Sequence, residues 1–375
     1  MKYSCEIQVL TPIHIFDREA LTNEMIWEGN KIGLVSPEIL ARKLRDSGSG
    51  ISYEELMQCS LNEILKQKGI DSTEVVTRWI MAGVQRERPK AVRLQLVSGC
   101  PALPCVPGSS LKGFIRTAIM SELPYVKQVD ITRLKREYSA LTKRYHSKKQ
   151  VMTKMATFID DEARILRFPW NTHTLNRDAF RGLIVGDAYQ VDTQSATRLE
   201  KVAVVSPRGG GNPQSNRSVI AEVLSPGTVF KARIVLNDQI KPLLDKLNLG
   251  TGIETVLKCA NRHSMRILSS DIAFFERFNK DCKFAGIIAR LKELTKQVQE
   301  DQTNYALVRL GLGGGYVARS VGAVVDKAVT GWVAENFYKD KASPDYFPRS
   351  RRVTTEWERP KNIMGWAKLT IIDKE

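Results

Sequence analysis

The residue types with the clearest chemical potential lie in residues 107–119, where two hydroxyls, a lysine and an arginine follow a Pro-Gly pair. The Pro-Gly pair interrupts the preceding structure, and we expect Ser109 or Ser110 to cap a helix that begins there. The free N–H groups and partial positive charge of a helix start attract anions. Lys112 and Arg116, four residues apart on one helix face, add two positive charges. The segment therefore predicts a phosphate-binding site.

The whole chain is basic, which makes an anionic partner the favoured explanation for this segment. It has 375 residues, with 57 Lys plus Arg against 41 Asp plus Glu, and a formal net charge of +16. Lysine and arginine side chains that bind phosphates release condensed counterions, so this excess favours nucleic acid as the partner. Solubility alone is the alternative explanation.

Composition also restricts the class of protein. A hydrophobic content of 42% supports a folded interior, and the length suits two domains or one elaborated domain. No apolar run approaches the roughly 20 residues that span a bilayer, and the first residues lack the apolar core of a signal peptide. We therefore expect a cytoplasmic protein with no membrane partner. The six cysteines form no CxxC pair, so we expect free thiols, no metal and no cofactor.

The patterns that would position the 107–119 segment mix strands with helices, which predicts an α+β fold. Alternation or turn residues indicate strands at 5–11, 92–97, 182–188 and 367–372, and a hairpin at 27–35. Helical spacing indicates helices at 37–45 with Ser36 as cap, 53–69, 71–84, 107–119 and 284–299. Residues 219–224 and 229–236 look like strands paired across a Ser-Pro-Gly-Thr turn, after a flexible polar loop at 206–217.

Residues 127–154 form a basic segment with nine Lys or Arg residues and two acidic ones. A solvated helix face explains this composition as well as a binding surface does. The interleaved Tyr138, Tyr145 and His146 favour RNA contact, because aromatic rings can stack on bases.

A glycine cluster at 311–315 precedes Tyr316 and Arg319. Its spacing does not match the G-x-G-x-x-G fingerprint of a nucleotide loop, and no GK[ST] sequence follows. It predicts a loop whose backbone passes very close to another part of the molecule.

Three of these features together resemble the RAMP superfamily of CRISPR-associated proteins. They are Thr-Pro-Ile-His-Ile at 11–15, Pro-Gly-Ser-Ser-Leu-Lys-Gly-x-x-Arg at 107–116, and the glycine loop at 311–315. Within the superfamily, the chain is most similar to the fifth subunits of type III-A Csm effector complexes. The resemblance implies two ferredoxin-like modules with helical insertions, which we expect at 1–185 and 186–375, the second carrying the glycine-rich loop.

The resemblance also implies a function. It points to a non-catalytic RNA-binding subunit that caps the effector backbone at the 3′ end of the CRISPR RNA and supports its maturation in antiviral defence. The expected partners are that RNA, the backbone RAMP subunits, target RNA and host nucleases. The expected RNA-binding residues are Gly108, Ser109, Ser110, Lys112, Arg116, Gly311, Gly313, Gly314, Gly315, Tyr316 and Arg319.

The chain departs from the family pattern after His14. Relatives often continue with a small Gly-Ser-Gly-type turn, whereas this chain has Phe-Asp-Arg-Glu at 16–19. The RNA contact that the family places on that turn is therefore not carried over to these residues.

Two other functions stay open. Some relatives are metal-independent endoribonucleases that use an N-terminal histidine, and His14 could serve as a general acid or base. No partner for it is evident, and we expect no catalytic residue. Other acidic candidates are Asp17, Asp187 and Asp192, none in a matching motif, and the Asp-Asp-Glu cluster at 160–162, which a solvated helix turn explains better. The third hypothesis is a structural assembly factor whose basicity is incidental.

Overall fold

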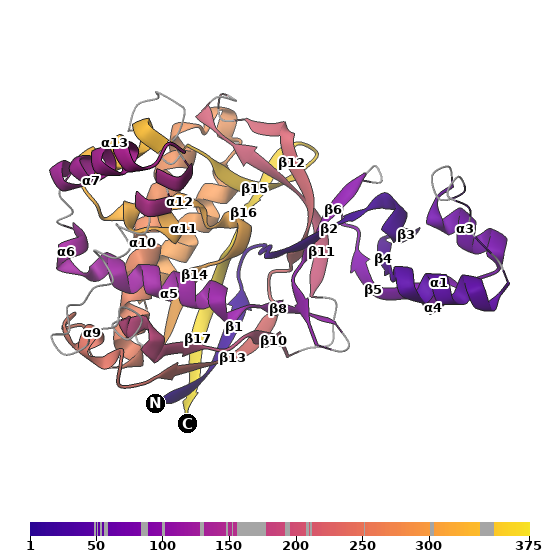
Figure 1. Cartoon of the computed structure of the whole chain (residues 1–375), viewed down its shortest axis with the longest axis horizontal. Coiled ribbons are helices and arrows are strands. Elements are labelled where there is room, and N and C mark those ends of the chain that lie inside the picture. The colour runs from indigo at the N-terminus through magenta and orange to yellow at the C-terminus, as the bar shows by residue number, and fades with distance from the viewer. Residues whose placement is uncertain are drawn as a thin grey trace.

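The structure is a computed structural model of the 375-residue chain. It describes residues 1–48, 50, 52, 55, 59–83, 89–99, 102–127, 131–147, 149–151, 153–155, 178–191, 196–207, 210, 212–250, 252–300, 304–337 and 349–375. Figure 1 shows a larger body, which holds both termini, and a smaller lobe that projects from one side.

The first sheet forms the centre of the larger body. Its strand order is β14 (Tyr305–Arg309), β17 (Trp366–Lys374), β1 (Lys2–Val9), β13 (Val229–Leu236), β10 (Ala188–Gln190), β8 (Leu103–Val106) and β7 (Val97–Ser98), and β9 (Leu183–Val185) pairs with β13. The first strand lies antiparallel between two partners, with Cys5 opposite Ala232 on β13 and Ile371 on β17. Its alternate residues are buried, as the sequence pattern predicts.

The second sheet connects the body to the lobe (Figure 1). Its strand order is β2 (Phe16–Leu21), β6 (Ala91–Gln95), β12 (Pro213–Leu224), β11 (Thr197–Val205), β5 (Val76–Met81), β4 (Lys31–Val35) and β3 (Met25–Glu28), while β15 (Arg351–Glu356) pairs with β11 and with β16 (Arg359–Ile363). Both sheets combine strands from either side of residue 185, so the expected domain boundary passes through two continuous sheets.

Helices cover the first sheet and build the lobe. The main core unites that sheet with α5 (Gly108–Glu122), α10 (Ile253–Arg277) and α11 (Ala285–Glu300). The lobe carries α1 (Pro37–Asp46), α3 (Leu61–Lys68) and α4 (Ser72–Val75). The other helices are α6 (Pro124–Lys127), α7 (Ile131–Arg144), α9 (Lys241–Asp245), α12 (Gly315–Arg319) and α13 (Lys327–Phe337), with 3-10 turns at Thr22–Glu24, Ala179–Gly182, Lys280–Cys282, Gly311–Gly313 and Val321–Ala323.

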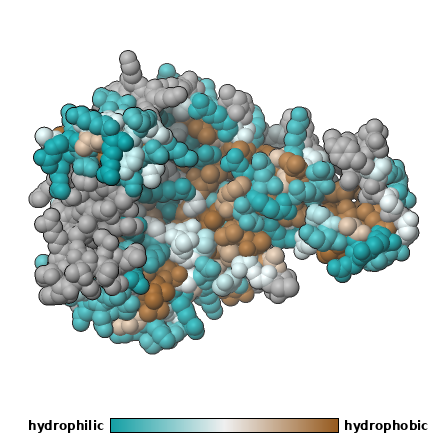
Figure 2. All heavy atoms as spheres, viewed as in Figure 1, coloured by the Kyte–Doolittle hydropathy of each residue, from teal (hydrophilic) through white to brown (hydrophobic). Residues whose placement is uncertain are grey.

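Apolar residues also reach the surface where the body meets the lobe. Figure 2 shows hydrophobic residues gathered along the middle of the visible face and hydrophilic residues over the lower edge of the lobe. No helix in the ranges given above is long and apolar enough to span a membrane.

Most local predictions from the sequence are confirmed. The α+β class, the first and last strands, the hairpin of β3 and β4 and the helices α5 and α11 all appear. Ser36 caps α1 by accepting a hydrogen bond from the Ile39 N–H. The helix predicted over 71–84 is wrong, because after one turn the chain becomes β5, which pairs with β4 and is rich in β-branched and aromatic residues.

The hairpin predicted for 219–236 is also wrong, because β12 and β13 belong to different sheets. The turn between them bonds to the end of β1 instead, where Gly227 N–H donates to the Val9 carbonyl at 2.8 Å and Val9 N–H donates to the Thr228 carbonyl at 2.9 Å. The turn is thus a crossover between the sheets. Part of the predicted loop before it, from Pro213 on, is already strand β12.

Candidate nucleic-acid interface

The three motifs that stand out in the sequence meet in one groove of about 510 Å³. We call this pocket the motif groove. Its lining is His14, Ile15, Phe16, Ser109, Ser110, Gly113, Phe114, Thr117, Arg309, Leu310, Gly311, Leu312, Ala318 and Arg319. One wall is the connection from β1 to β2, another is the first half of α5, and the third is the glycine loop with α12.

The start of α5 is capped differently from the prediction. Gly108 N–H donates to Asp187 Oδ1 at 2.7 Å, and neither serine makes a capping hydrogen bond. The serine-cap prediction is therefore wrong, because a distant carboxylate takes that position. Ser109 is exposed and Ser110 is half-buried, so both hydroxyls are left to line the groove. A Cβ at Gly108 would overlap the Val185 carbonyl, which explains the glycine.

The two cations of the α5 motif do not line the groove. The Arg116 guanidinium lies over the ring of Phe180, 5.6 Å from its centroid, and the Lys112 side chain is half-buried. The helix lines the groove with Ser109, Gly113 and Thr117, which are four residues apart and form the face next to that of Lys112 and Arg116.

The glycine loop approaches the N-terminal motif backbone to backbone. Leu312 N–H donates to the His14 carbonyl at 2.8 Å. Gly311 has a φ of +65°, and a Cβ there would overlap the same carbonyl, while one at Gly313 would overlap the Met364 carbonyl. Arg319 donates back to the Gly311 carbonyl and fixes the loop. The predicted close approach of this backbone is confirmed.

The remaining loop residues lie outside the lining of the groove. Gly314 is buried against the Arg319 side chain, and the Tyr316 ring packs where a Cβ at Gly322 would stand. Gly315 is exposed with a φ of +61°. The predicted RNA-binding residues that line the groove are Ser109, Ser110, Gly311 and Arg319, and those that do not are Gly108, Lys112, Arg116, Gly313, Gly314, Gly315 and Tyr316.

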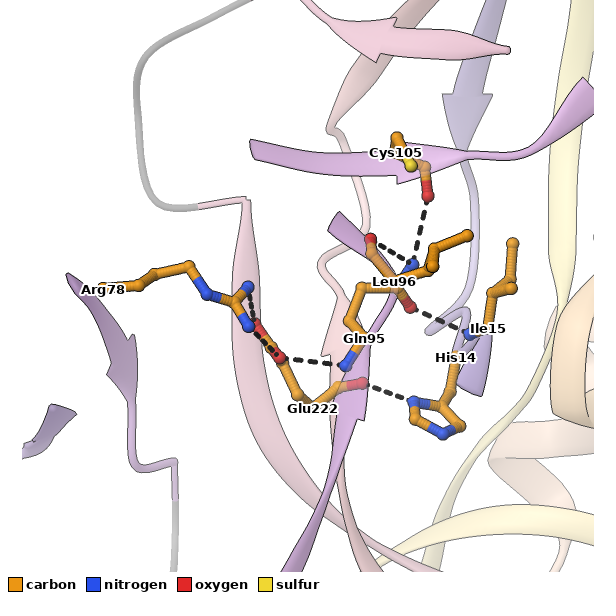
Figure 3. Close-up of polar contacts among 7 residues, drawn as sticks. All are labelled: His14, Ile15, Arg78, Gln95, Leu96, Cys105 and Glu222. Carbon is orange, nitrogen blue, oxygen red and sulfur yellow. Dashed lines mark hydrogen bonds and ion pairs between the residues drawn. The ribbon is translucent and has the colours of Figure 1, made fainter. Parts of the chain in front are cut away.

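A buried hydrogen-bond network holds the His14 segment in place (Figure 3). His14 Nδ1–H donates to the Glu222 carbonyl at 2.7 Å, and Ile15 N–H donates to Gln95 Oε1 at 2.8 Å. The Glu222 carboxylate accepts from both terminal nitrogens of Arg78, at 2.5 and 2.8 Å, and from Gln95 N–H at 2.9 Å. Sequence reasoning missed this network, because its members lie on strands far apart in the chain.

The His14 side chain is an uncharged base at neutral pH. Burial lowers its pKa, and the nearby guanidiniums of Arg93 and Arg352 lower it further, against the hydrogen bond to Glu222. The Nε2 atom is buried and has no hydrogen-bond partner among the described residues. The His14 side chain is only 1% exposed. The other ionisable residues in the lining of the groove are Arg309 and Arg319.

Three arginines lie at or near the groove. Arg319 lines it, the Arg93 guanidinium lies 5.8 Å from the ring centroid of the groove-lining Phe16, and the charges of Arg93 and Arg352 act on the buried His14. Burial lowers the pKa of Arg352, and the positive charges of Arg93 and Arg319 lower it further. None of them forms an ion pair with an acidic residue in the part of the chain that the structure describes. Like charges gathered without counter-ions make this the position where the groove can bind an anion. Arg93 on β6 and Arg352 on β15 carry no sequence motif, and only the overall basicity hinted at them.

The aromatic residues of the basic segment have a structural role. Tyr138 packs edge-on against Trp332 of α13, with ring centroids 5.2 Å apart, and Tyr145 borders the same hydrophobic cluster. The prediction that these two rings favour RNA contact is therefore not supported, while His146 is exposed.

The acidic and thiol candidates that the structure describes form no second site. Asp17 is exposed on β2, and Asp192 and the cluster at 160–162 lie outside the described residues. Cys5, Cys59, Cys105, Cys259 and Cys282 are free thiols, as expected, and Cys100 lies outside the described residues. Among the described side chains, no group of three His, Cys, Asp or Glu is placed to hold a metal ion.

His263 on α10 connects two walls of the groove. Its ring lies 5.4 Å from that of Phe114, and its Nε2 lies 3.4 Å from the Ala318 carbonyl. Burial lowers the pKa of His263 to about 4, with the charge of Arg266 contributing and that of Glu122 opposing. The uncharged imidazole is therefore part of the packing between α10, α5 and α12.

We expect acid to weaken the fold through His263. In the unfolded chain its pKa returns to 6.5, so between pH 6.5 and 4 the unfolded state binds a proton that the folded state does not. Its contribution to stability is complete above pH 6.5 and is lost as the pH falls toward 4, up to about 3 kcal/mol. Denaturant unfolding at several pH values should show a steeper acid loss for wild type than for His263→Gln, which cannot titrate. Parallel curves for the two proteins would contradict this.

Comparison with known proteins gives one family and one fold. A sequence model of the RAMP superfamily matches residues 6–318. A chain of a type III-A Csm–crRNA–target RNA ternary complex, solved by cryo-EM, has a TM-score of 0.66 at 18% identity, over 99% of this chain and 100% of that chain. Crystalline Csm5 from T. onnurineus has a TM-score of 0.64 at 18% identity, over 98% and 100%. No curated protein sequence matches. Identities of 18% show a shared fold.

Proposed function

Because the chain belongs to the RAMP superfamily, we propose that it is a non-catalytic RNA-binding subunit of a type III-A CRISPR effector complex. The observation that carries the proposal is the motif groove with Arg319 in its lining and Arg93 and Arg352 near it, none of the three ion-paired with a carboxylate among the described residues. The similarity of its fold to Csm subunits gives independent support.

The proposed mechanism is a grip on the RNA backbone that does not depend on base sequence. Arg93, Arg319 and Arg352 would pair with phosphates, and the hydroxyls of Ser109 and Ser110 would donate to phosphate or sugar oxygens. The start of α5 adds little further positive charge, because Gly108 is buried and Asp187 already accepts its N–H. Contacts of this kind position a strand and leave sequence selection to the RNA itself.

The place of the subunit in the complex is also part of the proposal. It would cap the backbone at the 3′ end of the CRISPR RNA, contact the neighbouring backbone subunits and support maturation of that end in antiviral defence. Two ferredoxin-like modules remain the proposed architecture, with each sheet combining strands from both sides of the expected boundary near residue 185. Target RNA and host nucleases are the further proposed partners.

Neutralising the groove arginines tests RNA binding directly. We expect the double variant Arg93→Gln/Arg352→Gln to bind single-stranded RNA about tenfold more weakly in fluorescence anisotropy. The slope of log affinity against log salt should fall by about 1.4, since each phosphate contact in a single strand contributes about 0.7. Lys241→Gln on α9 removes a charge outside the groove and should change little. Lys112→Gln tests the cation that the sequence motif favours.

The outcomes of this experiment separate the hypotheses. Unchanged affinity and salt slope in the arginine variant would overturn the proposed groove. RNA shortened by wild type without metal, but intact with His14→Ala, would favour the endoribonuclease. If backbone subunits assemble normally with the arginine variant and wild type alone binds no RNA, the chain is an assembly factor.

A further inference from the structure

We propose that Phe16 is a stacking platform for one unpaired nucleobase at the mouth of the motif groove. The inference rests on the proposed RNA-binding function and adds the part of the ligand that this residue contacts. Phe16 is the first residue of β2 and lines the groove, yet 55% of it is exposed. A phenylalanine ring left in water at the opening of a pocket presents a flat apolar surface that a ligand can cover.

The surroundings of the ring indicate what covers it. The Arg93 guanidinium lies 5.8 Å from the ring centroid, and His14 meets the ring edge with centroids 6.3 Å apart. Arg93 forms no ion pair with an acidic residue in the described part of the chain. An aromatic face beside an unneutralised cation matches a nucleotide, whose base stacks while its phosphate pairs with the guanidinium. The apolar side chain of a protein partner would instead have to lie against the positive charge.

The position of Phe16 is fixed by the fold. Phe16 lies opposite Gln95 in the pairing of β2 with β6, and Gln95 accepts a hydrogen bond from Ile15 N–H. The backbone that precedes the ring, at His14 and Ile15, is therefore held by the buried network of Figure 3. A ring on a fixed strand loses little further freedom when a base covers it.

Phe16 differs from the three residues that follow it in the Phe-Asp-Arg-Glu segment at 16–19. Of these four residues, Phe16 lines the groove, while Asp17, Arg18 and Glu19 are exposed outside it. Phe16 is thus the residue of this segment that offers the groove an aromatic face.

Variants of Phe16, combined with RNA strands that lack a single base, test the proposal. We expect Phe16→Ala to bind single-stranded RNA about tenfold more weakly than wild type, and Phe16→Trp to bind within about twofold of it. Leu21→Ala is the matched control, because Leu21 lies on the same strand, is 51% exposed and does not line the groove. Moving one abasic ribose along the RNA should weaken binding to wild type at one position, and that effect should vanish in Phe16→Ala.

The experiment distinguishes failure of the stacking proposal from failure of the proposed RNA-binding function. If wild type binds RNA and both Phe16→Ala and every abasic strand bind equally well, the stacking proposal is overturned while the RNA-binding function stands. If Phe16→Ala instead loses co-purifying backbone subunits with RNA affinity unchanged, the ring contacts protein and the proposal is wrong. Absence of RNA binding by wild type would overturn the proposed function itself.

Discussion

Replacing Asp271 by asparagine is expected to lower the free energy of unfolding by about 3–5 kcal/mol. Asp271 on α10 forms ion pairs with Arg309 and Arg351, and all three side chains are at most 7% exposed. Arg309 ends β14 directly before the glycine loop, and Arg351 begins β15. Without the carboxylate, the buried guanidiniums of Arg309 and Arg351 would lose the negative charge that they share, and the base of the loop would lose its anchor.

Denaturant unfolding measures this effect, and a second variant separates charge from packing. The triple variant Asp271→Leu/Arg309→Met/Arg351→Met removes all three charges and should recover much of the stability, because an apolar replacement of a buried ionic group is often neutral. If Asp271→Asn lowers the free energy of unfolding by less than about 1 kcal/mol, the three residues contribute no more than an exposed ion pair, and the prediction is wrong.

Replacing Glu222 by glutamine is the second large effect, with an expected loss of about 3–5 kcal/mol. The Glu222 side chain is fully buried and pairs with Arg78, whose side chain is 14% exposed. Glutamine keeps the shape and an acceptor for Gln95 N–H, but it leaves the Arg78 charge without a partner. We also expect weaker RNA binding, since the His14 segment depends on this network for its position.

A surface ion pair supplies the control for Glu222. Arg18 and Glu24 are 50% and 28% exposed, so Glu24→Gln should cost less than about 1 kcal/mol. Equal losses in the two glutamine variants would contradict a special role for the buried pair. Thermal unfolding and RNA anisotropy on the same samples distinguish loss of fold from loss of the groove.

The parts of the groove that local rules determine were predictable from the sequence. A Pro-Gly pair before a helical repeat identifies the start of α5. The glycine cluster indicates a close backbone approach, which the positive φ of Gly311 and the contacts at Gly311 and Gly313 confirm. The resemblance to RAMP proteins also holds, since the family model spans residues 6–318. Both kinds of signal lie within a few consecutive residues.

The parts that depend on long-range pairing were not predictable. Asp187 reaches Gly108 only because β9 and β10 bring it to the helix start, so serine capping was the better local expectation. Arg93 and Arg352 belong to the same second sheet, on β6 and β15, which are far apart in the sequence. The strands β12 and β13 have the pattern of a hairpin, and only the hydrogen bonds of their turn to β1 separate them.

The central position of β1 has a consequence for how a ribosome makes this protein. β1 is synthesised well before its neighbours β13 and β17, and Cys5 finally lies opposite Ala232 and Ile371. The nascent chain therefore carries a strand with one apolar side and both edges open until β13 has been made, which exposes it to misassociation. The groove is also completed late, because the His14 carbonyl accepts its hydrogen bond from Leu312 N–H, and Leu312 is synthesised almost 300 residues after His14. Completion of the groove is thus a late event in synthesis, and a chain that ends before β17 would leave one edge of β1 unpaired.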